Sequence, residues 1–253
     1  MTKYRVNKTK HVDQTKTVSF DFDGKSYHGF EGDTLASALL SNGVHLVGRS
    51  FKYHRPRGIM SSGSEEPNAI CQINEDTDLT EPNVRATEIE LYEGLKASSQ
   101  NCWPSVNFDI GGINNFISPF IPAGFYYKTF MWPKSFWKKI YEPLIRWSAG
   151  LGKSPTKPDP ELYDHKHIHC DVLIIGGGIS GIIASKIAAK NNLKTILIED
   201  KNILGGSTIF QKNENYKIND KYSGEWIDEE IAELKKLDNL TIKTRTSLAA
   251  YHL

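Results

Sequence analysis

The fold of this chain is decided by the stretch Asp171-Val172-Leu173-Ile174-Ile175-Gly176-Gly177-Gly178-Ile179-Ser180-Gly181. Its first half is a short apolar run rich in β-branched side chains, which is typical of a strand buried on both faces of a parallel sheet. The run breaks into a Gly-x-Gly-x-x-Gly pattern and continues into residues 182–190, whose apolar side chains recur at helical spacing. A strand, a glycine-rich turn and a helix in this order predict a dinucleotide-binding βαβ unit.

Three glycines of the turn have separate mechanical roles. Gly176 permits the tight turn, Gly178 lets the backbone approach a pyrophosphate, and Gly181 lets the helix pack close to the strand. The free N–H groups and the positive dipole end of the helix would then face the phosphates. The turn therefore predicts where the phosphates bind.

The residues after the helix support the same interpretation. Residues 193–198 are predicted to form the second parallel strand. Glu199 ends this strand 18 positions after Gly181, close to the roughly 20 expected for the acid that binds a ribose hydroxyl. A second glycine pair, Gly205-Gly206, follows near the same end of the sheet. The alternative is a structural βαβ unit that binds no ligand.

Length and composition limit the remaining possibilities. The 253 residues are enough for two domains and a connector. With 31 basic and 30 acidic residues, the charge gives no reason to expect a nucleic-acid partner. No apolar run approaches the roughly 20 residues that span a bilayer, and no signal peptide is visible. The three cysteines, Cys71, Cys102 and Cys170, are far apart, which favours a reducing cytoplasm.

Residues 1–95 are predicted to form a small β-grasp domain of the plant-type ferredoxin kind. A polar, basic arm (1–16) precedes a hairpin that turns at Asp23-Gly24. Asp33 or Thr34 can cap the following helix, and Gly43 lies just past its end. The predicted strands are 17–22, 26–30, 45–47, 69–73 and 87–91, and the inner face of the helix consists of Leu35, Ala38 and Leu39.

An iron–sulfur cluster is not expected in this domain. A [2Fe–2S] site of the plant type needs four thiolates, three of them spaced C-x₄-C-x₂-C. The loop where they would lie, residues 48–67, contains no cysteine. Four cations and two aromatic side chains of residues 48–58 could instead grip an anion, a cofactor phosphate or a neighbouring chain. Composition alone favours a solvated loop whose cations pair with Glu65 and Glu66.

Residues 96–165 are expected to form a connector rich in aromatic residues and proline, packed against something large. It ends in a stiff proline-rich linker at 153–160. The tract His165-x-His167-x-His169-Cys170 has metal-ligand residue types on one face of an extended segment. It leads straight into a buried strand and has no distant partner ligand, so no metal site is predicted.

Residues 166–253 are predicted to form a Rossmann-type domain. A second helix is expected at 224–237 and a third strand at 239–244. A doubly wound nucleotide domain has five or six strands, so we expect this domain to be truncated and the chain to be part of a longer polypeptide.

Several long and unusual runs carry a family resemblance that covers nearly the whole chain. They closely resemble the α subunit of heterotetrameric sarcosine oxidase. The runs are residues 32–40, 48–58, 65–69 and 122–133, and His167-x-His169-Cys170-Asp171. Because residues 48–58 belong to one of these family runs, the resemblance favours a contact role for this loop over a solvated surface.

The resemblance implies a cluster-less ferredoxin-like domain, an NAD-binding Rossmann domain and a C-terminal folate-binding region that these residues lack. It implies that a β subunit carries FAD and oxidises sarcosine, and that a covalent FMN at the α/β interface passes electrons to oxygen. The formaldehyde equivalent would be captured on tetrahydrofolate, and the partners would be the β, γ and δ subunits. The implied cofactor-binding residues are Gly176, Gly177, Gly178, Ile179, Ser180, Gly181, Glu199, Asp200, Lys201, Gly205, Gly206 and Ser207.

Two departures from the family pattern are small. The family often has Pro-Ala in place of Ile179-Ser180, and commonly Thr in place of Ser207. The oxidising site would lie on another chain, so no catalytic residue is assigned and the isolated piece is expected to be inactive. The alternatives are a subunit of a related amine, opine or proline dehydrogenase, and a truncated chain that only docks on partners.

Overall fold

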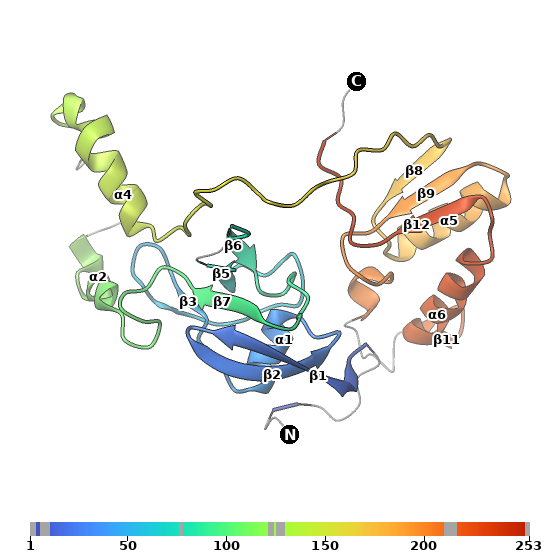
Figure 1. The fold of residues 1–253 in the computed structure, drawn as a ribbon, viewed down its shortest axis with the longest axis horizontal. Coiled ribbons are helices and arrows are strands. Elements are labelled where there is room, and N and C mark those ends of the chain that lie inside the picture. Colours follow the sequence, from blue (N-terminus) through green and yellow to red (C-terminus); the bar gives the residue numbers. More distant parts are fainter. Residues whose placement is uncertain are drawn as a thin grey trace. The chain divides into compact units, whose positions relative to one another are not determined.

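The computed structural model describes residues 4–5, 11–75, 78–120, 124, 130–209 and 217–250. The chain divides into two compact units, Met1–Leu162 and Tyr163–Leu253 (Figure 1). Each unit has its own sheet, and each is described by itself below. Within the described ranges, every helix is too short or too polar to cross a lipid bilayer.

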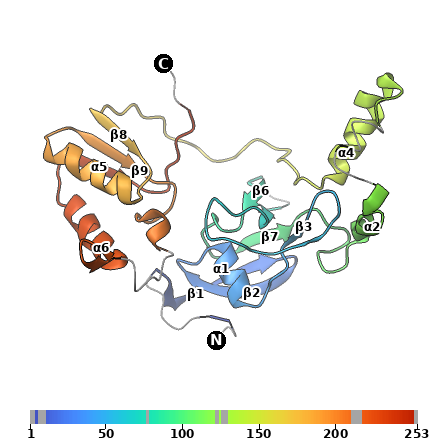
Figure 2. The same ribbon diagram turned by 180° about the vertical axis from the view of Figure 1, so that it is seen from behind.

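The first unit is built on a five-stranded mixed sheet with the order β2-β1-β7-β5-β6. Only the β1–β7 pair is parallel. Helix α1 (Leu35–Ser41) packs beside this sheet (Figure 2). The arrangement agrees with the predicted β-grasp domain. The strands are β1 (Asp13–Phe22), β2 (Lys25–Glu31), β5 (Ile70–Ile73), β6 (Glu81–Arg85) and β7 (Leu95–Ser99), and a separate two-stranded ladder joins β3 (Gly48–Arg49) to β4 (Pro56–Arg57).

Local sequence signals set the first elements as predicted. Asp23 and Gly24 both have positive φ, 53° and 72°, as the two-residue turn between β1 and β2 requires. Thr34 caps α1: its hydroxyl accepts from the Ser37 N–H at 3.2 Å, while the Ser37 hydroxyl accepts from the Thr34 N–H at 3.0 Å. Gly43, with φ of 78°, follows the end of the helix.

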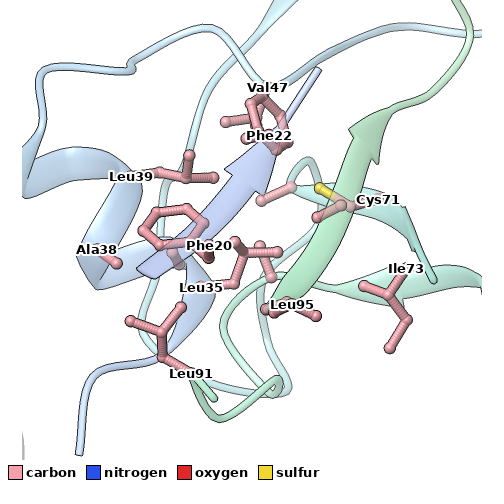
Figure 3. Close-up of a cluster of buried hydrophobic side chains, with 14 residues drawn as sticks. Phe20, Phe22, Leu35, Ala38, Leu39, Val47, Cys71, Ile73, Leu91 and Leu95 are labelled. Atoms are coloured by element: carbon pink, nitrogen blue, oxygen red, sulfur yellow. The ribbon is translucent and has the colours of Figure 1, made fainter. Parts of the chain in front are cut away.

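One apolar cluster holds the sheet and α1 together (Figure 3). Phe20 and Phe22 of β1 meet Leu35 and Leu39 of α1 there. Cys71 of β5 lies in the same cluster, and burial raises the pKa of its thiol to about 12, with a smaller contribution from Asp23. A thiol in this setting is a core side chain, because thiolate formation there is unfavourable.

Two of the strand predictions were wrong. Residues 45–47 do not form a strand, although the Val47 N–H donates to the Arg57 carbonyl at 3.0 Å. Residues 87–91 form a turn with one bridge from Glu90 to Thr34, and Leu91 is buried in the core. Their apolar pattern reflects burial without sheet pairing. The structure adds β6 and β7, and β7 extends past residue 95, where the first domain was expected to end.

Two residues of the N-terminal arm, Tyr4 and Arg5, contact α1 and the residues that flank it. The Arg5 guanidinium donates to both carboxylate oxygens of Asp33, at 3.1 and 2.6 Å, and to the Ser41 hydroxyl at 3.0 Å. Asp33 is 1 % exposed. The Tyr4 ring meets His45 edge-on at 5.5 Å between centroids. The arm was expected to be extended; these contacts fix Tyr4 and Arg5 to the domain, and β1 already begins at Asp13, inside the predicted arm.

The connector is attached to the β-grasp domain at both of its ends. Near its start, Arg49 donates from Nε and Nη2 to the Val106 carbonyl, at 2.9 and 2.6 Å. At its end, the Gln72 side chain bonds the Lys153 backbone in both directions, at 3.1 Å to the carbonyl and 2.9 Å from the N–H. The connector contains short helices: 3₁₀ turns at Ile110–Gly112, Ser118–Phe120 and Lys134–Phe136, α2 (Ile113–Phe116), a π-helical turn at Trp137–Tyr141, and α4 (Glu142–Ser148).

Part of the connector prediction concerns residues that the structure does not describe. Residues 121–123 and 125–129, which include most of the signature run 122–133 and Phe125, Tyr126 and Tyr127, lie outside the described residues. No contact is assigned to them.

The second unit contains a three-stranded parallel sheet with the order β12-β9-β8. Helix α5 packs on β8 and β9, and α6 lies beside α5. Lys186 of α5 joins the two helices by bonding Glu230 at 2.6 Å and Glu233 at 2.7 Å. The elements are β8 (Val172–Ile175), α5 (Ile179–Lys190), β9 (Thr195–Ile198), a 3₁₀ turn (Gly206–Ile209), β10 (Lys217–Ile218), β11 (Lys221–Tyr222), α6 (Ser223–Leu234) and β12 (Leu240–Lys243).

Strand β8 departs from the expectation that it is buried on both faces. Leu173 and Ile175 are 47 % and 57 % exposed, whereas every residue of the central strand β9 is buried. The apolar run predicted the strand correctly but not its exposure, because β8 is the outer strand of the described sheet.

Candidate functional site

The glycine turn between β8 and α5 has the geometry that its sequence predicts. Gly176 has φ of +94°, and its N–H donates to the Ile198 carbonyl at 2.8 Å. A Cβ added to Gly181 would lie 1.8 Å from the Gly176 carbonyl oxygen, so only glycine fits there. The turn and the first turn of α5 are thus in direct contact, as close packing of helix on strand requires.

Among the four glycines of this turn, Gly178 is the one that the local packing and backbone do not require. Its φ of −73° is open to any residue. A Cβ added there would come no closer than 3.9 Å to a neighbouring atom, the Gly206 Cα. The space at the Cβ position of Gly178 is therefore wide enough for a methyl group. No described side chain caps α5 at this N-cap residue, which leaves the positive end of the helix dipole facing that space.

The second glycine pair lies against the first turn. The Gly205 N–H donates to the Gly177 carbonyl at 2.8 Å. Gly205 and Gly206 have φ of +130° and +57°, and a Cβ on Gly206 would lie 3.0 Å from the Gly178 Cα. The sequence predicted this proximity. It did not predict Thr208, a buried residue whose hydroxyl bonds the Gly205 carbonyl and holds this second loop.

Glu199 reaches the glycine turn from the end of β9. One carboxylate oxygen accepts from the Gly177 N–H at 2.5 Å and the other from the Lys201 N–H at 3.1 Å. The side chain is buried, with 6 % of the residue exposed. The carboxylate therefore lies beside the turn that would hold the phosphates, where an adenosine ribose is bound in dinucleotide folds.

The two adjacent carboxyl groups titrate differently. Burial raises the pKa of Glu199, and its hydrogen bond with Asp200 raises it further, while the N–H bonds from Lys201 and Gly177 oppose this shift. The pKa of Asp200 is lowered, mainly by the same hydrogen bond with Glu199 and then by the Lys201 charge. The two carboxyl groups are therefore in contact with each other beside the glycine turn.

The predicted residues Ile179, Ser180 and Ser207 also lie around this site. Ile179 and Ser180 form the first turn of α5, and Ser180 is exposed. Ser207 is exposed in the 3₁₀ turn Gly206–Ile209. A segment that the sequence did not indicate also contributes: the Thr246 N–H donates to the Glu199 carbonyl at 2.9 Å. This backbone contact comes from 47 residues further along the chain, so no local pattern could have predicted it.

These features together fit the ADP half of a dinucleotide. The backbone at Gly178 would face the pyrophosphate, the end of α5 would stabilise its negative charge, and Glu199 would accept from ribose hydroxyls. The strand order β12-β9-β8 is that of the first three strands of a doubly wound nucleotide-binding sheet.

In the first unit, a buried carboxylate lies at the centre of the loop that holds the cluster in ferredoxins. The Glu66 carboxylate accepts four backbone N–H bonds: from Met60 at 2.7 Å, Ser61 at 2.6 Å, Asn68 at 2.7 Å and Ala69 at 3.1 Å. Burial raises the pKa of Glu66, but these four bonds outweigh it and leave the pKa below its ordinary value. The loop contains no thiol, and its N–H groups already surround an anion. These residues do not fit a [2Fe–2S] cluster.

This geometry shows that one prediction from composition was wrong, namely that the cations of residues 48–58 pair with Glu66. Glu66 is buried among backbone N–H groups, so it does not pair with the cations of residues 48–58. Arg49 binds the connector as described above, and Arg55 Nε donates to the Asn115 amide oxygen at 2.9 Å. The His54 ring nitrogen Nδ1 lies 2.7 Å from Asp109 Oδ2. The described part of the loop therefore contacts other parts of the chain.

No group of metal-ligating side chains emerges from the described ranges. Three or more His, Cys, Asp or Glu residues do not converge there as a metal site. His165, His167 and His169 are exposed along the segment that leads to β8.

Two protein families match the two units. Residues 15–102 match the family described as a 2Fe-2S iron-sulfur cluster binding domain, and residues 171–249 match the family of FAD dependent oxidoreductases. The first match fits a ferredoxin-like fold for the β-grasp unit. The second match identifies the unit that contains the glycine turn as part of an oxidoreductase.

Curated relatives match the chain from end to end. The chain is 47 % identical over 252 residues to sarcosine oxidase subunit alpha of Rhizobium meliloti (strain 1021), covering 100 % of this chain and 25 % of the relative. It is 29 % identical over 239 residues to the subunit of the same name from Corynebacterium sp. (strain P-1), covering 94 % of this chain and 20 % of the relative. The chain thus spans a quarter or less of the length of these relatives.

A solved structure supports the fold. The crystal structure of L-proline dehydrogenase from P. horikoshii superposes with a TM-score of 0.50 at 21 % identity, covering 93 % of this chain and 34 % of that one. At this identity the likeness concerns the fold alone.

Proposed function

We propose that this chain is the N-terminal, cofactor-binding part of a sarcosine oxidase alpha subunit, because the whole chain resembles such subunits. The complete enzyme would oxidatively demethylate sarcosine to glycine and transfer the formaldehyde unit to tetrahydrofolate. The observation that carries the proposal is the convergence of the Gly176–Gly181 turn, Glu199 and the Gly205-Gly206 pair on one site.

The cofactor of this site is proposed to be NAD, held by a Rossmann-type domain. The resemblance favours NAD, whereas the match to FAD dependent oxidoreductases favours FAD. Both cofactors share the ADP half that the site fits, and a bound nicotinamide would supply hydride transfer. Beyond this site, FAD on the β subunit, FMN at the α/β interface and tetrahydrofolate in a region outside these residues complete the proposal. The partners would be the β, γ and δ subunits, in the cytoplasm.

We expect the purified chain to bind NADH more tightly than NADPH, because the Glu199 carboxylate repels a 2′-phosphate. Titration by nicotinamide fluorescence measures both affinities. The matched variant Glu199→Gln should reduce the preference by about tenfold, because it removes roughly one unit charge near the ribose. A stoichiometric yellow flavin in the absorbance spectrum of the purified chain would assign the site to FAD instead.

A further part of the proposal is that the β-grasp domain holds no iron–sulfur cluster. Glu66 occupies the centre of the loop, and Cys71 lies in the hydrophobic core. We expect iron analysis of anaerobically purified chain to give far less than one iron per chain, with no visible absorption from bridging sulfide. Two irons and two sulfides per chain would contradict this.

A further inference from the structure

The loop that leads into β5 contains a nest of backbone N–H groups. Two short stretches, residues 60–61 and 68–69, turn their N–H groups toward one place, which the Glu66 carboxylate fills. The first stretch donates to one carboxylate oxygen and the second stretch donates to the other. Backbone N–H groups that converge in this way are a means by which proteins bind small anions. The geometry is that of a carboxylate site whose ligand belongs to the same chain.

The backbone of the nest is also held by contacts that do not involve the carboxylate. The Glu66 N–H donates to the Gly63 carbonyl at 3.1 Å, and the Glu66 carbonyl accepts from Arg85 Nε at 3.1 Å. The Thr87 hydroxyl donates to the Gly63 carbonyl at 2.7 Å. These bonds remain when the Glu66 side chain is shortened. The four N–H groups should therefore stay near their positions without it.

Beside the nest lies a polar group that Glu66 does not use. The Ser61 hydroxyl oxygen is buried and has no hydrogen-bond partner within the described ranges. The N–H of the same residue is one of the four donors, so this hydroxyl is close to the bound carboxylate. A buried hydroxyl without a partner is costly. A free anion can move toward it, whereas the carboxylate of Glu66 is fixed by its own side chain.

We infer that residues 60–69 form a binding site for a small carboxylate anion, which Glu66 fills in the unmodified chain and which acetate fills when this side chain is cut back to alanine. The alanine substitution removes one methylene and the carboxylate, a group of the size of acetate. Acetate would place its two oxygens among the same four donors, and hydrogen bonds to a charged acceptor are strong. Met60, which supplies one donor, is 75 % exposed, so a free anion has a short way in. The inference concerns the first unit alone and does not depend on the cofactor of the second.

In the unmodified chain the site should take no free anion. The tethered carboxylate competes as an intramolecular ligand, and a short tether gives it a high effective concentration. Glutamine at the same position also fills the space, although it carries no charge. Glu66→Ala and Glu66→Gln are therefore a matched pair, because both lack the carboxylate and only the alanine variant leaves room for acetate.

The test is urea unfolding of the two variants and the unmodified chain at neutral pH, with sodium acetate or sodium chloride added. From zero to about 0.5 M acetate, the ratio of folded to unfolded Glu66→Ala should rise about tenfold more than that of the unmodified chain, as expected for a dissociation constant of about 50 mM. The ratio for Glu66→Gln should change by less than about twofold relative to the unmodified chain. The chloride series measures the general effect of salt. Equal gains in both variants, or an equal gain from chloride, would overturn the inference.

Amide NMR spectra of Glu66→Ala locate the bound anion. The N–H resonances of Met60, Ser61, Asn68 and Ala69 should shift together as acetate is added, with the dissociation constant that unfolding gives. The unmodified chain should show no such shift. If Glu66→Ala does not fold in plain buffer, it is refolded from urea with acetate: recovery of the folded state only with acetate supports the site, and a chain still unfolded in about 0.5 M acetate overturns it. A folded variant whose four resonances do not respond overturns it as well.

Discussion

Alanine at Gly178 should abolish most dinucleotide binding while leaving the fold intact. The backbone there is open to any residue, and an added Cβ meets no atom within 3.4 Å, so the thermal unfolding midpoint should stay within about a degree. The methyl group would stand in the space proposed for the pyrophosphate. A clash of this kind costs about 1–3 kcal/mol, which corresponds to roughly fivefold to 150-fold in affinity.

The matched variant is Gly181→Ala, three residues further along the same turn. Its Cβ would lie 1.8 Å from the Gly176 carbonyl oxygen, and backbone cannot move aside as a flexible side chain does. We expect about 3 kcal/mol lower stability, measured by urea unfolding, and loss of binding as a consequence. If Gly178→Ala binds NADH and FAD as well as the unmodified chain does, the phosphates do not pass this turn. If Gly181→Ala is fully stable, the close packing described here is wrong.

The second large effect is expected at Glu66, the anion at the centre of the loop. Glutamine there keeps one acceptor but replaces the other with an amide donor, which would face the N–H groups of Met60 and Ser61 or of Asn68 and Ala69. Loss of charge-assisted bonds and unpaired buried donors should lower the unfolding free energy by about 2–4 kcal/mol. The neighbouring exposed Glu65→Gln is the control and should change it by less than about 0.5 kcal/mol.

The pH dependence of stability provides an independent test of Glu66. Its pKa is lower in the folded chain than in the unfolded chain, so the unfolded state binds more protons at mildly acidic pH. The stabilisation is therefore complete above the unfolded value, near pH 4.3, and is lost as the pH falls through the folded value. Urea unfolding between pH 3 and 7 should show a shallower acid loss for Glu66→Gln than for Glu65→Gln. Parallel profiles for the two variants would contradict the role given to Glu66.

Local patterns in the sequence predicted the elements that depend on neighbours along the chain. The turn at Asp23-Gly24, the cap at Thr34 and the strand–turn–helix around Gly178 each follow from a few consecutive residues. The glycines of the candidate site were predictable because left-handed φ at Gly176 and steric closeness at Gly181 exclude other residues.

Non-local contacts were not predictable in this way. Strand β7 pairs with β1 across more than seventy residues and has a small, polar sequence that resembles a loop. The apolar residues 87–91 are buried without joining the sheet. Glu66 has the sequence context of a surface acid, and only the fold turns four N–H groups toward it.

The two-way amide bond between Gln72 and Lys153 has a consequence for how this protein can change during evolution. The connector leaves the β-grasp domain near Val106 and returns at Lys153, so the connection between these residues is attached to the domain at both of its ends. Residues inserted into or deleted from this connection need not disturb the pairing of the five-stranded sheet. Natural variation in length should therefore concentrate between those two attachments, while the length of the β-grasp domain stays constant.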